Sequence, residues 1–335
     1  NNVLAGSSHI AGGENNTIKN GNANILFGQT NTAEGSYLGA IGKDNSVYYQ
    51  SAVALGQANK DSGWATIAGG LSNTVNAGVQ YSALFGTTNR IGGGTAHMLM
   101  GESNLVSAGR ANTVAGYANN VITGNFISAF GTSNDILAGN SHIAGGENNT
   151  IKSGNANSLF GQTNTADGSY LGAIGRDNSV YYQSSVALGQ ANKDSGWASI
   201  AGGLSNTIES NTQFNAVFGS NNIMTRNLAI SNAGQGNFSA GMYNINSGTS
   251  SIALGARNRT SSQFGFAANY NNLANSFCMS AFGHFNDTVS AVPGGTYLPN
   301  EMLFSNRIFS KFMYVLANCN SSATETNSLS FCSKT

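Results

Sequence analysis

The sequence of 335 residues has very little charge of either sign. Charged residues make up 8% of the chain, and 14 basic side chains balance 14 acidic ones, whereas about a quarter of a typical soluble domain is charged. Zero net charge leaves no electrostatic footprint for nucleic acid or for an anionic membrane. Solubility must therefore come from Asn, Ser, Thr and Gln, and a polar surface of low charge suits an extracellular fibre.

Cysteines are also few, and a membrane-spanning run is missing. Cys278, Cys319 and Cys332 are odd in number and lack C-x-x-C spacing, which argues against a zinc site. Cys319 and Cys332 can pair in an oxidising compartment and leave Cys278 free, and three unpaired thiols are equally allowed. No apolar run is long enough for a transmembrane helix, so we expect no membrane insertion by this segment. No signal peptide is visible, and because Asn1 aligns with Asn134 inside a repeat, we expect a segment of a longer protein.

The most prominent feature is internal repetition. Residues 40–64 recur almost unchanged as residues 173–197, and they belong to a 133-residue duplicated block in which residues 1–75 match residues 134–208. An enzyme rarely needs two copies of a site at such a distance, whereas a stacked repeat structure duplicates easily. The duplication therefore favours a solenoid.

A shorter phrase, apolar-Gly-x-x-Asn, recurs inside the duplicated block. Its glycine returns every 14 to 16 residues from Gly13 to Gly219, and the rhythm then passes through Gly234 and a 21-residue step to Gly255. The duplicated block thus contains nine short units in the same order of lengths. We expect residues 1–290 to form one repeat domain and residues 291–335 a non-repeat cap or neck segment.

Each unit holds two short apolar phrases separated by turn residues. A small residue, usually Ala, stands two positions before the glycine, and a larger apolar residue stands just before it. Asn follows three positions after the glycine, and an aliphatic residue often follows two positions later. This alternation predicts two strands of about four to five residues, and its regular spacing argues against a disordered chain. Glycine at about every seventh position excludes helices, because each would cost a helix interior roughly 1 kcal/mol.

Glycine and asparagine are expected at the corners of each coil. Glycine adopts positive φ freely, and asparagine tolerates the left-handed region better than most residues. Asparagine at one position of every coil also permits a ladder of side-chain amides along the stack. No phosphate-binding glycine motif is present. The turn positions predicted in the two copies are Gly42, Asn45, Gly56, Asn59, Gly175, Asn178, Gly189 and Asn192.

These observations predict an all-β parallel β-roll solenoid of about 20 coils with 14–16 residues per coil. Coils of this length are too short for a three-sided β-helix, so we expect a flattened roll of two strands and two turns. A roll this thin encloses too small a core to offset the ordering of its chain. Self-association would provide a second buried surface. The large apolar residues expected there are Phe27, Phe85, Phe130, Phe160 and Phe218.

Three phrases point to a known family. "SAVALGQAN" (51–59), "SVALGQAN" (185–192) and "SIALGARN" (251–258) closely resemble the repeat of YadA-type trimeric autotransporter adhesin heads. The resemblance implies a left-handed parallel β-roll, a homotrimer and an extracellular position on a cell surface, where such heads attach to matrix proteins or host cells. The neck, stalk and membrane anchor of that family have no counterpart in this sequence.

Two other fibrous functions stay open. The same roll resembles the tail-fibre heads of phages and large viruses, which would place the chain on a virion surface as a receptor-binding protein. The stretch at residues 300–331 breaks the coil rhythm and is more similar to the β segment that follows such heads than to a stalk. A structural subunit of an extracellular filament is the third possibility.

Aromatic residues within the duplicated phrase form the candidate ligand site. One interpretation is a polar-aromatic patch that binds a host protein, a matrix protein or a glycan, and the alternative is that these aromatics fill a groove between chains. The candidate binding residues are Tyr48, Tyr49 and Trp64 in the first copy and Tyr181, Tyr182 and Trp197 in the second.

Asp61 and Asp194 occupy a position that is aliphatic in most coils. An unpaired carboxylate cannot lie in a narrow dry core. We therefore expect either Lys60 or Lys193 to pair with the neighbouring aspartate, or this corner of the coil to open to solvent.

Catalytic and metal-binding patterns are missing. His9 and His142 are copies of one position, His97 and His284 stand alone, and no H-x-x-H or H-x-E arrangement occurs, so we expect no metal and no cofactor. The scattered acidic residues include Glu34, but its copy is a shorter aspartate, which would displace a catalytic carboxyl. We expect a non-enzymatic protein whose partners are further copies of itself and an extracellular ligand.

Overall fold

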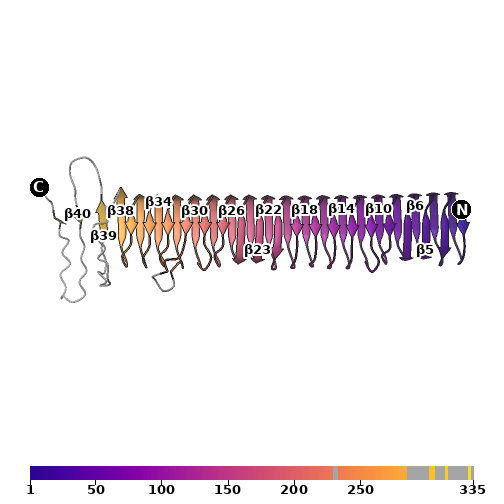
Figure 1. Ribbon diagram of the computed structural model, residues 1–335, viewed down its shortest axis with the longest axis horizontal. Helices are drawn as coiled ribbons and strands as arrows, with labels where there is room; N and C mark the ends of the chain where they lie inside the picture. Colours follow the sequence, from indigo (N-terminus) through magenta and orange to yellow (C-terminus); the bar gives the residue numbers. More distant parts are fainter. Residues whose placement is uncertain (229–232, 285–301, 306–313, 316–330, 333–335) are drawn as a thin grey trace. The chain divides into compact units, whose positions relative to one another are not determined.

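The computed structural model describes residues 1–228, 233–284, 302–305, 314–315 and 331–332. Every regular element in these ranges is a β-strand, and no helix occurs among them. The strands form a parallel β-solenoid of about twenty turns, as the sequence predicts. The chain divides into two compact units, Asn1–Tyr170 and Leu171–Thr335, in each of which the strands are stacked side by side (Figure 1).

The first unit contains two parallel sheets, one from the even-numbered and one from the odd-numbered strands. The even-numbered strands form the long-strand sheet: β2 (Ile10–Glu14), β4 (Ile25–Gln29), β6 (Gly39–Lys43), β8 (Val53–Gln57), β10 (Ile67–Leu71), β12 (Ala83–Thr87), β14 (Met98–Glu102), β16 (Thr113–Tyr117), β18 (Ser128–Thr132), β20 (Ile143–Glu147) and β22 (Ser158–Gln162). The odd-numbered strands form the short-strand sheet: β1 (Asn2–Val3), β3 (Thr17–Asn20), β5 (Thr32–Ser36), β7 (Ser46–Gln50), β9 (Lys60–Asp61), β11 (Thr74–Val75), β13 (Arg90–Ile91), β15 (Leu105–Val106), β17 (Asn120–Val121), β19 (Asp135–Ile136), β21 (Thr150–Ser153) and β23 (Thr165–Ser169).

The second unit repeats this plan. Its long-strand sheet contains β24 (Gly172–Arg176), β26 (Val186–Gln190), β28 (Ile200–Leu204), β30 (Ala216–Ser220), β32 (Phe238–Met242), β34 (Ile252–Ala256), β36 (Phe266–Tyr270), β38 (Ser280–His284) and β39 (Met302–Ser305). Its short-strand sheet contains β25 (Ser179–Gln183), β27 (Lys193–Asp194), β29 (Thr207–Ile208), β31 (Ile223–Met224), β33 (Ile245–Asn246), β35 (Arg259–Thr260) and β37 (Leu273–Ala274).

The core is a column of mostly aliphatic side chains, from Ala to Ile and Leu, one from each strand. The second residue of each long strand points inward, as Ala40, Ala54 and Leu84 do, and all three are fully buried. The second residue of each short strand, such as Val47, meets them from the other sheet. The core is therefore formed by the residue two positions before each glycine and by the residue two positions after each asparagine, as the period-2 alternation predicts.

The two strands of a coil differ in length, which corrects the prediction of two similar strands. The long strands keep five residues, but many short strands, such as Lys60–Asp61, have only two. Further parallel bridges lie beyond many of the short strands, as between Trp64 and Gln80. The second side of the coil is thus interrupted by a corner, which places Trp64 on a separate edge.

The repeat glycine adopts positive φ as predicted, but it is the fourth residue of the long strand and precedes the corner, and the asparagine has another role. Gly42 and Gly56 have φ of 124° and 107°, and a Cβ on Gly56 would lie 2.3 Å from the carbonyl oxygen of Gly70. The left-handed residue is the one before the asparagine, such as Asp44 (φ 57°) before Asn45. The prediction that asparagine supplies the left-handed conformation is therefore wrong, because its side chain is needed inside the coil.

The irregular stretch after Gly219 also requires a correction. Gly241, and not Gly234, pairs in register with Gly219 and Gly255. The insertion therefore lies within one coil, between β31 and β32, and the next coil returns to 14 residues. Gly234 (φ 80°) instead stands at the second corner of the coil, where its carbonyl oxygen accepts from the Gln213 nitrogen and its own nitrogen donates to Gly248 O.

Most of the predicted segment 291–335 lies outside the described residues, as does Cys319. Of its described parts, β39 pairs in parallel with β38, and β40 (Tyr314–Val315) pairs antiparallel with β41 (Phe331–Cys332). Cys278 is a half-buried free thiol. Among the described residues no helix has the length and hydrophobicity needed to cross a membrane.

Candidate functional site

The long-strand sheet carries a continuous apolar outer surface. We define the apolar face as the outward side chains of the first and third residues of each even-numbered strand. In the first unit its large exposed members are Ile10, Ile25, Phe27, Ile41, Leu55, Ile67, Phe85, Met98, Met100, Phe130, Ile143 and Phe160. In the second unit they are Ile174, Leu188, Ile200, Phe218 and Phe238.

Register aligns the members of this face on successive strands, with Thr113, Ser128 and Ser158 as its polar positions in the first unit. Phe27, Ile41 and Leu55 are direct neighbours on successive strands. Where the third residue is glycine, the ring of the next strand lies over it, since a Cβ on Gly12 would lie 2.7 Å from the Phe27 ring. The twelve exposed side chains of the first unit each expose 36% to 53% of their surface, which amounts to on the order of 1,000 Å². A typical monomer exposes patches of only about 300–600 Å².

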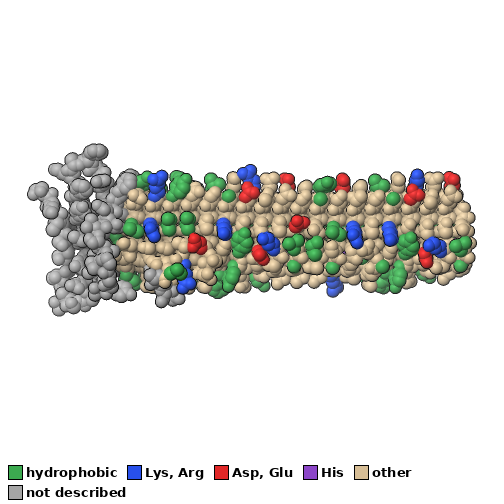
Figure 2. Space-filling view, viewed as in Figure 1, with side chains coloured by type: hydrophobic (Ala, Val, Ile, Leu, Met, Phe, Trp, Pro, Cys, Tyr) green, Lys and Arg blue, Asp and Glu red, His purple; other side chains and the backbone are tan. Residues whose placement is uncertain are grey.

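The short-strand sheet has the opposite character. Its outward residues include Thr32, Ser46, Thr74, Arg90 and Asp135. By contrast, no described first or third residue of an even-numbered strand is charged, although the fifth residues of some of these strands, such as Lys43 and Glu102, are charged and exposed beside the apolar face. Figure 2 shows one view in which charged side chains are scattered among uncharged polar groups, with small apolar clusters between them. The coil is therefore amphipathic across its thickness.

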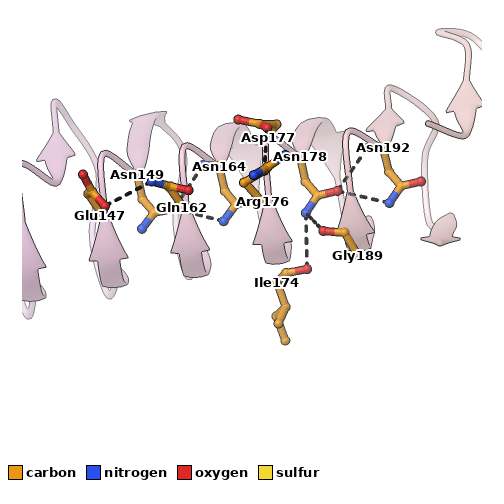
Figure 3. Close-up of polar contacts among 10 residues, drawn as sticks. All are labelled: Glu147, Asn149, Gln162, Asn164, Ile174, Arg176, Asp177, Asn178, Gly189 and Asn192. Carbon is orange, nitrogen blue, oxygen red and sulfur yellow. Dashed lines mark hydrogen bonds and ion pairs between the residues drawn. The ribbon is translucent and has the colours of Figure 1, made fainter. Parts of the chain in front are cut away.

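A ladder of buried asparagines fixes the corner that supports the apolar face. The Asn45 amide nitrogen donates to Asn31 Oδ1 (3.0 Å), Ile41 O (3.2 Å) and Gly56 O (2.7 Å). Asn45 Oδ1 in turn accepts from the backbone and side-chain nitrogens of Asn59 at 3.1 Å. The predicted ladder is confirmed within each unit, with members such as Asn149 and Asn164 in the first and Asn178 and Asn192 in the second (Figure 3).

Trp64 lies in a cluster of aromatic and amide side chains on the edge beyond the short strands. Its backbone pairs with Gln50 on one side and Gln80 on the other. Its ring lies 5.0 Å from the Tyr81 ring, centroid to centroid, at an interplanar angle of 53°. We call Gln50, Trp64, Gln80 and Tyr81 the Trp64 cluster. Tyr81 was not predicted, because two extra residues in its coil hide its register with Trp64.

The duplicated copy builds the same arrangement. Trp197 pairs with Gln183 and Gln213, and its ring lies 5.1 Å from that of Phe214. We call these four residues the Trp197 cluster. A phenyl ring thus takes the place of the Tyr81 phenol, while the distance and the tilt between the rings are almost unchanged.

The four predicted tyrosines lie beside these clusters. Tyr48 is half-buried on the short-strand sheet, and so is its copy Tyr181. Tyr49 and Tyr182 are highly exposed and adopt φ of 82° and 83°. Non-glycine residues with positive φ recur along the coils, at Asp44 and Ser51 for example, so this conformation does not single out the two tyrosines. Tyr49 precedes Gln50 in the chain, whereas the ring partner of Trp64 is Tyr81, which was not predicted.

Asp61 and Asp194 are fully buried, which corrects the expectation of a lysine partner or an open corner. Asp61 Oδ1 accepts hydrogen bonds from Thr66 Oγ1 (2.5 Å) and the Gly63 backbone nitrogen (3.1 Å). Lys60 is exposed, and the ion pairs found among the described residues do not include it. Burial raises the pKa of Asp61 to about 6 against the effect of these hydrogen bonds.

The second copy preserves this arrangement with Ser199 in place of Thr66. Asp194 Oδ1 accepts from Ser199 Oγ (2.5 Å) and the Gly196 nitrogen (3.1 Å), and burial raises the pKa of Asp194 to about 6. Ser185 donates to the Gly196 carbonyl oxygen at 2.7 Å. Each aspartate thus holds the turn that leads to its tryptophan.

Buried histidines replace asparagine at the opposite corner of the coil. His97 Nε2 lies 3.2 Å from Gly93 O, and its Nδ1 accepts from the Asn112 backbone nitrogen at 3.3 Å. His142 makes the same two contacts, with Ala138 O and the nitrogen of Asn157. Because Nδ1 faces a backbone N–H, the neutral ring carries its hydrogen on Nε2. Burial lowers the pKa of both rings.

Acidic side chains do not converge on a common point. Glu34 forms an exposed ion pair with Lys19 at 3.2 Å, and its shorter copy Asp167 accepts instead from Ser153 Oγ at 2.6 Å. Within the described ranges no group of three or more His, Cys, Asp or Glu side chains is placed to hold a metal ion. The arrangement that the structure offers is therefore a pair of surfaces, one apolar and one aromatic.

Comparisons with known proteins add no family. No family model matches the sequence, and no curated protein matches it either. What the structure supports is the all-β parallel solenoid of about twenty turns.

Proposed function

We propose that this chain is the left-handed β-roll head of a homotrimeric extracellular fibre whose role is attachment to a host cell, a matrix protein or a glycan, without catalysis. The observation that carries the proposal is the amphipathic coil. The apolar face has an area close to the roughly 800 Å² that each partner contributes to a standard protein interface, and the opposite sheet is polar.

A second and third copy of this chain are the occupants of the apolar face. Its two columns carry no charge, and they run along the whole described length of each unit. A repeated flat surface of this kind is matched by another copy in the same register, because each coil then meets an equivalent coil. Three copies around one axis would bury the face that one copy leaves exposed.

The Trp64 and Trp197 clusters are the ligand-binding surfaces in this proposal. They lie at the corner between the short strands and the next long strands, outside the two columns of the apolar face, and the proposal requires that association leaves them accessible. Each combines flat aromatic rings with amide groups, which supply contact area and hydrogen bonds at little entropic cost. Three chains with two clusters each would bind with high avidity even when one contact is weak.

Binding to a panel of immobilised matrix proteins and glycans tests this role. We expect the wild-type chain to be retained by at least one panel member and W64A/W197A to lose at least tenfold in apparent affinity. F126A is the matched control, because Phe126 is an exposed corner aromatic with no tryptophan beside it in the bridge register. Retention of W64A/W197A at wild-type strength, or no retention of the wild type by any panel member, would contradict the proposal.

A further inference from the structure

Two carboxyl groups in the core each leave one oxygen without a partner. Asp61 Oδ1 and Asp194 Oδ1 accept two hydrogen bonds each, whereas Oδ2 of both residues has none among the described atoms. A buried ionised oxygen without a partner is costly. The duplicated block nevertheless keeps this arrangement in both copies.

Asn246 shows what this position accommodates. It is the second residue of its short strand, as Asp61 is, and its Oδ1 accepts from Ser251 Oγ at 2.5 Å. Its amide nitrogen, which stands where Asp61 has Oδ2, donates to Ser251 O (3.0 Å) and Phe238 O (3.2 Å). The position therefore offers two carbonyl acceptors to a donor, and a carboxyl can match it only when Oδ2 carries a hydrogen.

We propose that Asp61 and Asp194 are proton-binding groups that the folded coil holds as neutral carboxylic acids, and that loss of the Oδ2 proton to water loosens the Asp-Ser-Gly-Trp turns that present Trp64 and Trp197. This regulation rests on the proposed ligand-binding role of the two clusters. By strand register, the carbonyl acceptors equivalent to those of Asn246 are the oxygens of Thr66 and Val53 for Asp61. Ionisation replaces the donor by a negative charge facing these oxygens. The backbone N–H of Val53 also donates toward this carboxyl and lowers its pKa, but burial has the larger effect and raises it.

No charged group near Asp61 favours its ionised form. The inward residues of the adjacent strands are Val47, Ala54, Ala68 and Val75, all buried and uncharged. The titratable groups of β7 and β9 are Tyr48, Tyr49 and Lys60, none of which is buried.

Asp194 has an equivalent setting. Its inward neighbours are Val180, Ala187, Ala201 and Ile208. The titratable groups of β25 and β27 are Tyr181, Tyr182 and Lys193, which are not buried.

The sign of the effect follows from burial. Because burial raises both pKa values to about 6 from an ordinary value of 3.8, the folded chain keeps protons that the unfolded chain has released between these two pH values. The stability contributed by the neutral carboxyls is complete below about pH 3.8 and is lost as the pH rises through about 6. The turns before the tryptophans are therefore tightest in mild acid.

The two tryptophans of the chain, Trp64 and Trp197, report on these turns directly. We expect the fluorescence of the wild-type chain to change between pH 4 and 8 with a midpoint near pH 6, and the D61N/D194N variant to show no such transition. D44N/D177N is the control, because these exposed aspartates lie in the same duplicated phrase, and it should keep the wild-type transition.

Two further measurements need no ligand and separate this proposal from the binding role. Unfolding at pH 5 should release close to two more protons from the wild type than from D61N/D194N. The infrared carbonyl stretch of a protonated carboxyl should be present in the wild type at pH 5 and lost at pH 8, which needs no variant. An identical fluorescence titration in wild type and D61N/D194N, or the lack of a protonated carboxyl band at pH 5, would overturn the proposal.

Discussion

Asn45 Nδ2 lies 3.0 Å from Asn31 Oδ1, and the same contact recurs between Asn59 and Asn45 on the next coil. Each rung also binds a carbonyl four residues earlier and the glycine carbonyl of the following coil. The ladder thus satisfies the backbone groups that the corner would otherwise leave buried and unpaired.

Replacing one rung should be severely destabilising. N45A leaves the Gly56 carbonyl and the Asn59 backbone nitrogen without their side-chain partner in a fully buried position. We expect a loss of about 3–5 kcal/mol in the free energy of unfolding, measured by chemical denaturation. N22A, which removes one exposed hydrogen bond, should cost no more than about 1 kcal/mol. Equal effects of the two substitutions would contradict the role of the ladder.

We expect the glycine of the apolar-Gly-x-x-Asn repeat, such as Gly56, to be essential. A loop glycine with the same sign of φ should be dispensable. In G56A the new Cβ would lie 2.3 Å from the Gly70 oxygen, so we expect a loss of more than about 4 kcal/mol or failure to fold. Gly78 has φ of 85° with no atom within 4 Å of an added Cβ, so G78A should cost only about 1–2 kcal/mol. Thermal unfolding of the two variants checks this, and comparable losses would refute the steric argument.

His97 and His142 should make the chain sensitive to acid. Burial lowers their pKa in the folded state, so the unfolded chain takes up protons first as the pH falls below about 6.5, and this part of the stability is lost. In H97N/H142N the asparagine side chain can make the same two contacts, as Asn24 does with Asn20 O and the Leu38 nitrogen.

The melting temperature of H97N/H142N should therefore fall less than that of the wild type between pH 7 and pH 5. Both proteins keep Asp61 and Asp194, whose contribution has the opposite sign, so the difference isolates the histidines. Parallel curves for the two proteins would show that the rings are not the acid-sensitive groups.

Much of the fold could be predicted from the sequence because it repeats. One glycine and one asparagine per coil set the period. The residue directly before each glycine is usually large and apolar, and the residue one position earlier is usually small. Period-2 geometry then places Ala54 inside and Leu55 outside without further information. The amide ladder follows from the same argument.

The predictions that were wrong depend on the register between strands, which cannot be read from the sequence when the coil length varies. Tyr81 follows Trp64 by 17 residues, so its position beside the indole depends on where the longer coil inserts its extra residues. Gly234 and Gly241 are both preceded by a small apolar residue, and only strand pairing selects Gly241. The hydrogen bond between buried Asp61 and Thr66 was also not predicted, because the lysine next to Asp61 suggested an ion pair.

The mass of the folded chain in solution tests the central claim most directly, since the apolar face is expected to be covered by two further copies. Sedimentation equilibrium of the wild type should give about three times the chain mass of 34.4 kDa. F85E/F130E places charges in the apolar face and should sediment as a single chain, while T74E on the short-strand sheet should keep the trimer. A wild-type chain that is folded by circular dichroism and sediments at 34.4 kDa at every concentration would contradict the account.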